Sequence, residues 1–110
     1  MPYRLLVLFA AGAAAFAQTN TGSITGLVTD AAGAAIPGAK VAIREIATNA
    51  QLNTVTTAAG NYTAPSLPPG TYEVVITSQG FRRATANGLE VRATQTVTQN
   101  FTLQVGDVAE

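Results

Sequence analysis

The chain of 110 residues contains no cysteine, no histidine and no tryptophan. Without cysteine and histidine it cannot form disulfide bonds, thiolate nucleophiles, imidazole-based catalytic triads or most zinc and iron sites. Charged residues make up only 11% of the sequence, sum to zero net charge and form no run of one sign. Nucleic acid therefore has no electrostatic support as a partner. From these absences we expect no catalytic residue, no cofactor and no metal, and we predict that the chain is not an enzyme.

Residues 1–17, MPYRLLVLFAAGAAAFA, have the layout of a secretory signal peptide. One cation, Arg4, precedes a short apolar stretch, and the small residues Ala15 and Ala17 stand where signal peptidase requires them. We predict a helical signal peptide that is cleaved after Ala17 and followed by a short leader, residues 18–22. About a dozen apolar residues fall short of the roughly 20 that cross a bilayer. We therefore expect no transmembrane segment in the mature chain, and export to the periplasm, the outer membrane or the extracellular space.

From residue 22 onward apolar residues alternate with polar ones, which is the period of half-buried β-strands. Seven runs show this alternation, four clearly and three weakly: 22–30, 39–46, 71–78 and 95–105, then 52–58, 61–66 and 87–93. The clear runs place a shared set of residues on the inward face: Ile24, Val28, Val41, Ile43, Tyr72, Val74, Ile76, Val97, Phe101, Leu103 and Val105. Nothing after residue 17 has helical periodicity. The sequence therefore predicts an all-β domain.

Turn-forming residues separate these runs at short spacing, as in a small antiparallel sandwich. The turn residues on which this prediction depends are Asp30, Gly33, Pro37, Gly38, Pro69, Gly70 and Gly80. In residues 68–71, proline at the second position and glycine at the third predict a type II turn in which Gly70 has a positive φ. We therefore predict a seven-stranded antiparallel β-sandwich over residues 23–105, followed by a C-terminal tail, residues 106–110.

Two segments, GSITGLVTDAAGAAIPGAKVAI and TTAAGNYTAPSLPPGTYEVVITSQGF, combine turn and aromatic signals: Gly26, Asp30, Gly33, Pro37 to Ala39, Gly60, Tyr62, Leu67, Pro69 to Tyr72, Gly80 and Phe81. In these residues the chain resembles the carboxypeptidase regulatory-like family, a relative of the transthyretin-like and Cna B-type sandwiches. The resemblance implies an Ig-like or prealbumin-like sandwich, also called a carbohydrate-binding-like fold, without catalytic function. With its predicted signal peptide, the chain is similar to the start of Oar-like TonB-dependent outer-membrane receptors.

Some Cna B-type relatives form an isopeptide bond between a lysine and an asparagine, and the resemblance raises that question for Lys40 and Asn100. Lys40 alternates with inward Val41, and Asn100 alternates with inward Phe101, so both side chains are expected to face water. Burial of the Lys40 charge would also require a carboxylate nearby. We do not expect this bond, and we interpret Lys40 as a solvated strand residue.

Two function hypotheses remain open. In the first, the domain is a structural or interaction module of the cell envelope, and it is the N-terminal extension or a detached fragment of a TonB-dependent receptor. Its partner would be an envelope protein or the receptor's own plug or barrel, contacted through a β-edge or loops. In the second, the domain binds a glycan, which requires exposed aromatic rings. The candidate contact residues are Tyr62, Tyr72, Arg82 and Arg83, and solvent exposure of the two tyrosines separates the hypotheses.

Overall fold

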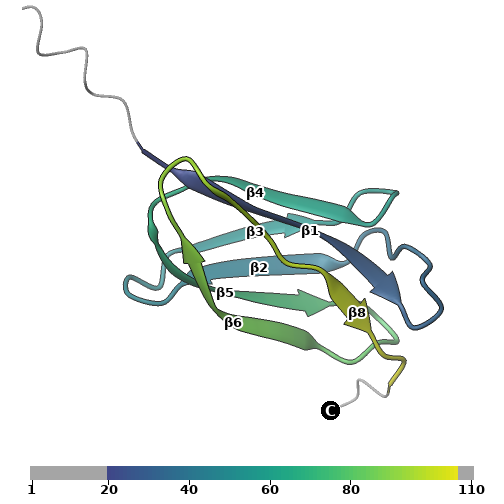
Figure 1. Ribbon diagram of the computed structural model, residues 1–110. Coiled ribbons are helices and arrows are strands. Elements are labelled where there is room, and N and C mark those ends of the chain that lie inside the picture. Colours follow the sequence, from purple (N-terminus) through teal and green to yellow (C-terminus); the bar gives the residue numbers. More distant parts are fainter. Residues whose placement is uncertain (1–19, 107–110) are drawn as a thin grey trace, which may run out of the picture.

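A computed structural model describes residues 20–106; the predicted signal peptide with Ala15 and Ala17 lies outside them, as do residues 107–110 of the predicted tail. Eight β-strands follow one another in the described part: β1 (Gly22–Asp30), β2 (Lys40–Glu45), β3 (Gln51–Val55), β4 (Asn61–Leu67), β5 (Gly70–Thr77), β6 (Ala84–Val91), β7 (Thr96–Thr98) and β8 (Phe101–Leu103). They form two sheets that pack face to face (Figure 1). The predicted all-β sandwich is confirmed, with eight strands in place of seven. The described residues include no helix of the length and apolarity needed to cross a membrane.

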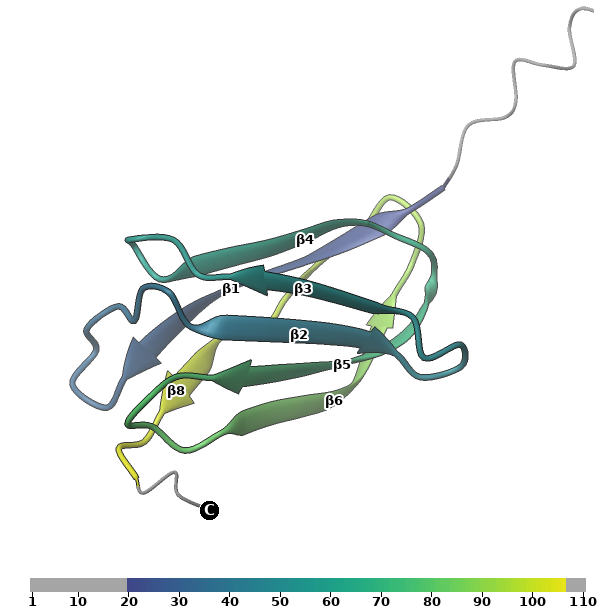
Figure 2. The same cartoon turned by 180° about the vertical axis from the view of Figure 1, so that it is seen from behind.

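The chain crosses repeatedly between the two sheets. The first sheet has the order β4-β1-β7, with β8 also paired to β1, and the second has the order β3-β2-β5-β6. Figure 2 shows the second sheet from its outer side, with β3 at one edge and β6 at the other. Neighbouring strands are antiparallel, as predicted, except that β7 and β8 run parallel to β1. The last strands of the domain therefore lie beside its first strand.

The core consists of the inward-facing side chains of both sheets. Alternate residues of β1, β2 and β5 are buried, as the alternation in the sequence predicts, and other strands and loops complete one cluster: Ile24, Val28, Ile36, Ala39, Val41, Ile43, Tyr62, Ala64, Leu67, Tyr72, Val74, Ile76, Val91, Phe101 and Leu103. Tyr62 and Phe101 meet within it, with ring centroids 6.3 Å apart and ring planes at 46°. Such a tilted arrangement is favourable for an aromatic pair. This single cluster joins the two sheets.

The last hydrophobic run departs from the predicted pattern at its end. Phe101 and Leu103 are buried, but Val105 is 75% exposed, so the prediction that Val105 faces inward is wrong. β1 ends at Asp30, which pairs with Leu103. Beyond that pair no sheet remains for the chain to follow, and Val105 instead forms an isolated bridge with Phe81.

β7 and β8 are separated at Gln99 and Asn100, where the chain passes closest to Gly26 of β1. The Gln99 N–H donates to the Thr25 carbonyl at 2.8 Å, whereas the Leu27 N–H donates to the side-chain Oδ1 of Asn100 at 2.9 Å. A Cβ atom on Gly26 would lie 1.9 Å from the Gln99 carbonyl oxygen. Glycine at this position therefore admits the close approach of another backbone. An asparagine side chain replaces one backbone acceptor of the ladder, which divides the predicted strand in two.

Candidate functional site

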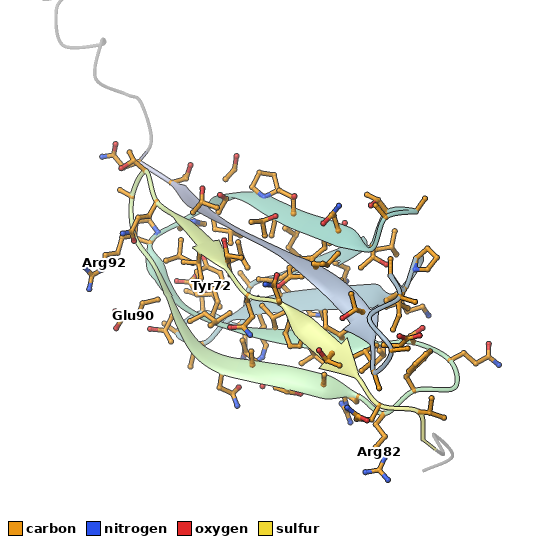
Figure 3. The ribbon with its side chains drawn as sticks, turned by 45° about the vertical axis from the view of Figure 1, so that its right-hand side comes forward. Tyr72, Arg82, Glu90 and Arg92 are labelled. Atoms are coloured by element: carbon orange, nitrogen blue, oxygen red, sulfur yellow. The ribbon has the colours of Figure 1, made fainter. Side chains whose placement is uncertain are left out.

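Both tyrosines predicted as contact residues belong to the core. Tyr62 is 1% exposed and Tyr72 is 3% exposed, and Figure 3 shows Tyr72 inside the sandwich. The Tyr62 hydroxyl donates to the Gln99 carbonyl at 2.6 Å, and the Tyr72 hydroxyl donates to the Pro68 carbonyl at 2.7 Å. Burial raises the pKa of Tyr62 to about 12; burial and then the Glu45 carboxylate raise the pKa of Tyr72. Neither ring offers a platform to a sugar, so the tyrosine exposure that the glycan hypothesis requires is not found at these two positions.

Arg82 and Arg83 are exposed and follow the turn after β5. Figure 3 shows the Arg82 side chain projecting into solvent near the end of the described chain. Glu90 and Arg92 project elsewhere on the surface and form an exposed ion pair, with 3.4 Å between Arg92 Nη2 and Glu90 Oε1. Within residues 20–106 neither Arg82 nor Arg83 forms an ion pair. Both arginines remain candidate contact residues.

The predicted turn residues shape loops at the ends of the sandwich. Asp30 ends β1, and its Oδ1 accepts hydrogen bonds from the N–H groups of Ala32 and Ala34, each at 2.9 Å. The next turns contain exposed Pro37 and three glycines with positive φ: Gly33 (88°), Gly38 (71°) and Gly80 (87°). This left-handed conformation is costly for a residue with a Cβ atom. The role of these residues is therefore to reverse the chain.

Gly70 does not have the positive φ of a type II turn, and this part of the prediction is wrong. It is already the first residue of β5 and pairs with Val91 of β6. A positive φ of 58° occurs instead at Ser66, before Pro69 and close to the end of β4. A Cβ atom on Gly70 would lie 2.6 Å from Oε2 of Glu45. This contact is with the far end of the flexible Glu45 side chain, and the backbone conformation at Gly70 does not itself require glycine.

The outer side of the second sheet carries a shallow hollow that the sequence did not predict. Its volume is about 510 Å³, and it is lined by residues of three strands: Lys40, Val41, Ala42, Asn53, Thr54, Val55, Val75 and Thr77. A second hollow of about 490 Å³ shares Lys40 and Thr77 with it and extends to the loop that contains Ser78, Gln79 and Phe81. Lys40, the single lysine of the chain, lies where the two hollows meet.

The strand register places apolar side chains beside this lysine. Lys40 stands opposite Val55 of β3 and Thr77 of β5. The next outward residue of β2 is Ala42, which stands opposite Val75 of β5. Val55 is 55% exposed. We call the surface formed by these five residues the Lys40 face; it combines apolar side chains with one cation.

Charge on this side of the sheet is compensated except at Lys40. Arg44, the next outward residue of β2 after Ala42, donates from Nε and Nη2 to Oε1 of Glu73 at 3.1 and 2.8 Å. In the described part of the chain Lys40 forms no ion pair. No group of three acidic side chains that could hold a metal ion occurs between residues 20 and 106. The Lys40 face therefore suits an anionic group with apolar surroundings.

Lys40 lies in the second sheet, whereas Asn100 lies in the break between β7 and β8 beside the first sheet. Lys40 is exposed on β2 of the second sheet, whereas Asn100 accepts a hydrogen bond from Leu27 N–H of the first sheet. The prediction that both side chains face solvent is confirmed. In this arrangement the two side chains are not placed to form a bond with each other.

Residues 23–104 match the family model of the carboxypeptidase regulatory-like domain. The chain belongs to this family. The resemblance seen in the sequence is thereby confirmed. The chain is also 36% identical over 104 residues to the TonB-dependent transporter Oar of Myxococcus xanthus, a match that covers 90% of this chain and 10% of the transporter. The carboxypeptidase regulatory-like domain therefore spans a small part of that relative's length.

Solved structures share the fold of the domain at lower sequence identity. The Bacillus anthracis TIE protein superposes with a TM-score of 0.68 at 20% identity, over 83% of this chain and 19% of that chain. Catechol 1,2-dioxygenase from Pseudomonas arvilla superposes with a TM-score of 0.63 at 16% identity, over 83% of this chain and 54% of that chain. At these identities the likeness shows the fold alone.

The dioxygenase overturns the prediction that the chain is not an enzyme. That prediction took the sandwich and the missing cysteine and histidine to exclude catalysis. Catechol 1,2-dioxygenases nevertheless contain the same sandwich as this carboxypeptidase regulatory-like domain. The fold is therefore compatible with enzymes, and the two missing residue types exclude only the chemistry that needs them.

Sequence reasoning interpreted Lys40 as a solvated strand residue and so missed the face around it. A signal was present, because Ala42 and Val75 occupy outward positions where a water-facing strand normally has polar residues. Each of these residues is unremarkable alone. They become a surface only when the register of β2 and β5 sets them opposite each other.

Proposed function

We propose that this carboxypeptidase regulatory-like domain is a cell-envelope module of a TonB-dependent transporter, joined to it or acting beside it, and that it works by contacting a protein partner. The observation that carries the proposal is the 36% identity to the transporter Oar over 90% of the chain. The predicted signal peptide with Ala15 and Ala17 supports export, and the periplasm or outer membrane is the compartment in which such a module meets its partner.

The surface of the domain supports contact with protein. The Lys40 face offers exposed apolar side chains around an uncompensated cation, and Arg82 and Arg83 add positive charge beyond β5. Interfaces between proteins combine apolar and charged groups in this way. A glycan is not proposed as the ligand, because the aromatic rings between residues 20 and 106 are buried or half-buried: Tyr62, Tyr72, Phe81 and Phe101.

A chimaeric transporter tests the proposal. The region of Myxococcus xanthus Oar that matches this chain is deleted, or replaced by this domain, and outer-membrane assembly and the transporter-dependent phenotype are compared. We expect the domain to restore what the deletion removes. The matched control carries the corresponding part of the Bacillus anthracis TIE protein, which shares the fold at 20% identity. If the domain restores no more than this control, the proposed function is wrong.

A further inference from the structure

The proposed function does not name the surface that contacts the partner. The edges of the two sheets show where an added strand has backbone groups to pair with. At the β4 edge, the C=O of Asn61 accepts from the Thr57 N–H at 2.8 Å, and the Asn61 N–H donates to Thr57 Oγ1 at 3.2 Å. Further along β4, Pro65 has no N–H, and Ser66 has a positive φ of 58°. Proline and irregular backbone prevent the pairing of another strand. Among the β4 residues whose backbone groups point away from β1, Thr63 alone has both an N–H and a C=O to which no described residue hydrogen-bonds.

The edges on the other side of the sandwich are also interrupted. In β6 the register with β5 shifts between Ala86 and Leu89, so that Asn87 and Gly88 together oppose Glu73. This is a β-bulge, and Gly88 within it has a positive φ of 72°. In the first sheet, β7 and β8 have three residues each and are separated by the break described above. Neither edge presents a regular strand of useful length.

β3 ends the second sheet without any such interruption. Its sequence, QLNTV, has no charge, no proline and no glycine, and its pairing with β2 has no bulge. Two hydrogen bonds set the phase of this pairing: Thr56 N–H to Ala39 O at 3.0 Å, and Glu45 N–H to Ala50 O at 2.8 Å. In antiparallel strands, hydrogen-bonded pairs alternate with pairs that are not bonded to each other. The phase therefore decides which residues of β3 have backbone N–H and C=O groups that point away from β2.

The outward-bonding residues of β3 are Gln51, Asn53 and Val55. Each stands one or three positions, an odd number, from the nearer of the bonded residues Ala50 and Thr56, so each forms a non-bonded pair with β2. Their N–H and C=O groups face away from the sheet, and no described residue hydrogen-bonds to them. The side chains of Asn53 and Val55 line the hollow of the Lys40 face. One segment can therefore contact the free backbone edge and the Lys40 face together.

We propose that the free edge of β3 binds an extended segment of a partner protein, which adds a strand to the second sheet and carries a carboxylate toward Lys40. This inference rests on the proposed function and names its contact site. The backbone groups of Gln51, Asn53 and Val55 supply the hydrogen bonds, as in other cases of β-strand addition. An added strand lies about 10 Å from β2, a distance that a lysine and a glutamate side chain span together. The carboxylate pairs with Lys40 across Val55.

Charge favours such a segment over a second copy of the chain. In a symmetric antiparallel β3–β3 contact centred on Asn53, Val55 of one copy would stand opposite Gln51 of the other. The row of neighbouring side chains across the joined sheets would then begin at Lys40, which stands beside Val55. It would end at Arg44 of the second copy, which stands beside that copy's Gln51. Arg44 of the second copy is already paired with its own Glu73, so Lys40 would gain no carboxylate. An acidic segment supplies the missing negative charge, whereas a second copy supplies none.

Two matched synthetic peptides test the inference on the full chain. Both alternate valine and threonine; one has a central glutamate and the other a central lysine. We expect the glutamate peptide to shift the backbone amide resonances of Gln51, Asn53 and Val55 and to bind about tenfold more tightly than the lysine peptide. In Lys40→Gln, which removes the charge at similar size, we expect the two peptides to bind equally.

Proline substitutions separate the edge from the rest of the domain. Asn53→Pro removes an outward N–H and keeps the bonded pairs with β2, so the fold is retained. We expect it to weaken the glutamate peptide about tenfold, because one hydrogen bond is lost and the others are displaced. The matched control is Thr63→Pro on the β4 edge, which removes an N–H from the corresponding outward position. It should leave peptide affinity unchanged.

Four results would overturn the inference: no binding of the glutamate peptide, equal binding of both peptides to the unaltered chain, resonance shifts confined to β4 or β6, or unchanged affinity in Asn53→Pro. If the chain binds neither peptide but self-associates, and Asn53→Pro abolishes this self-association, then the strand that pairs with β3 comes from a second copy and not from an acidic segment. Asn53→Pro in the Oar chimaera distinguishes the two proposals. If it restores function as well as the unaltered domain does, the edge inference fails alone; if the unaltered domain fails to restore, the proposed function is the one that fails.

Discussion

At the scale of the residue, Tyr62 connects the first sheet to the break between β7 and β8. Its ring packs against Phe101, and its hydroxyl donates to the Gln99 carbonyl at 2.6 Å. Burial raises its pKa from 10.0 to about 12, so the folded protein favours the neutral phenol. This contribution to stability is complete below about pH 10 and is lost as the pH rises toward 12.

Tyr62→Phe tests this pH dependence. At pH 8 we expect the variant to lose about 1–2 kcal/mol of unfolding free energy, because the Gln99 carbonyl loses its donor. As the pH rises from 10 to 12 the difference between the variant and the unaltered chain should shrink, since only the latter has a phenol to ionise at this position. Urea unfolding at several pH values measures both. A difference that stays constant to pH 12 would contradict the assignment.

Two glycines test whether space or backbone conformation constrains β1 and its loop. In Gly26→Ala the new Cβ atom meets the Gln99 carbonyl oxygen at 1.9 Å, and we expect a loss of about 3 kcal/mol or more because backbone must move. In Gly33→Ala nothing lies within 4 Å, and only the positive φ of 88° opposes the change, at about 1–2 kcal/mol. Urea midpoints of the two variants compare the costs. Equal costs would contradict the close approach at Gly26.

At the scale of the element, alternation in the sequence predicts a strand well where one face is buried and the other meets water. β1, β2 and β5 satisfy this condition, and their inward residues are those predicted. Val105 has the right parity, but β1 ends before it, which the local sequence does not reveal. The Lys40 face was not predicted for a similar reason, because Ala42 and Val75 form a surface only through the pairing of β2 with β5. Local pattern gives parity, whereas register and strand ends depend on distant partners.

The side chain of Asn100 allows the chain to leave β1 after β7 and to rejoin it at β8. Asn100→Leu removes the acceptor of the Leu27 N–H, and we expect a loss of about 1 kcal/mol. The matched control, Asn100→Asp, keeps an oxygen at the same place and should stay close to the unaltered chain at pH 7. Hydrogen exchange of the Leu27 amide provides a local measurement: protection should fall in Asn100→Leu and persist in Asn100→Asp. Loss of protection in both variants would show that the carboxamide has another role.

At the scale of the whole molecule, one cluster of buried side chains holds both sheets, so neither sheet is a separate folding unit. β1 pairs with strands near both the middle and the end of the described chain, which ties the first and last strands into one structure. The domain has no cysteine and therefore no disulfide that could keep one part folded alone. Small domains with a single core unfold in one step. Loss of the core at any point is therefore expected to unfold the two sheets together.

Phe101→Ala tests this cooperativity, because Phe101 lies in β8 of the first sheet and its effect on the second sheet passes only through the core. We expect a loss of about 3–5 kcal/mol, with β-sheet circular dichroism and tyrosine fluorescence following a single urea transition. Tyr72 lies in β5 and Tyr62 in β4, so the fluorescence reports on both sheets. Val105→Ala, at a site 75% exposed, is the control and should change stability little. Separate transitions of the two signals would mean that the two sheets do not unfold together and would contradict a single cooperative core.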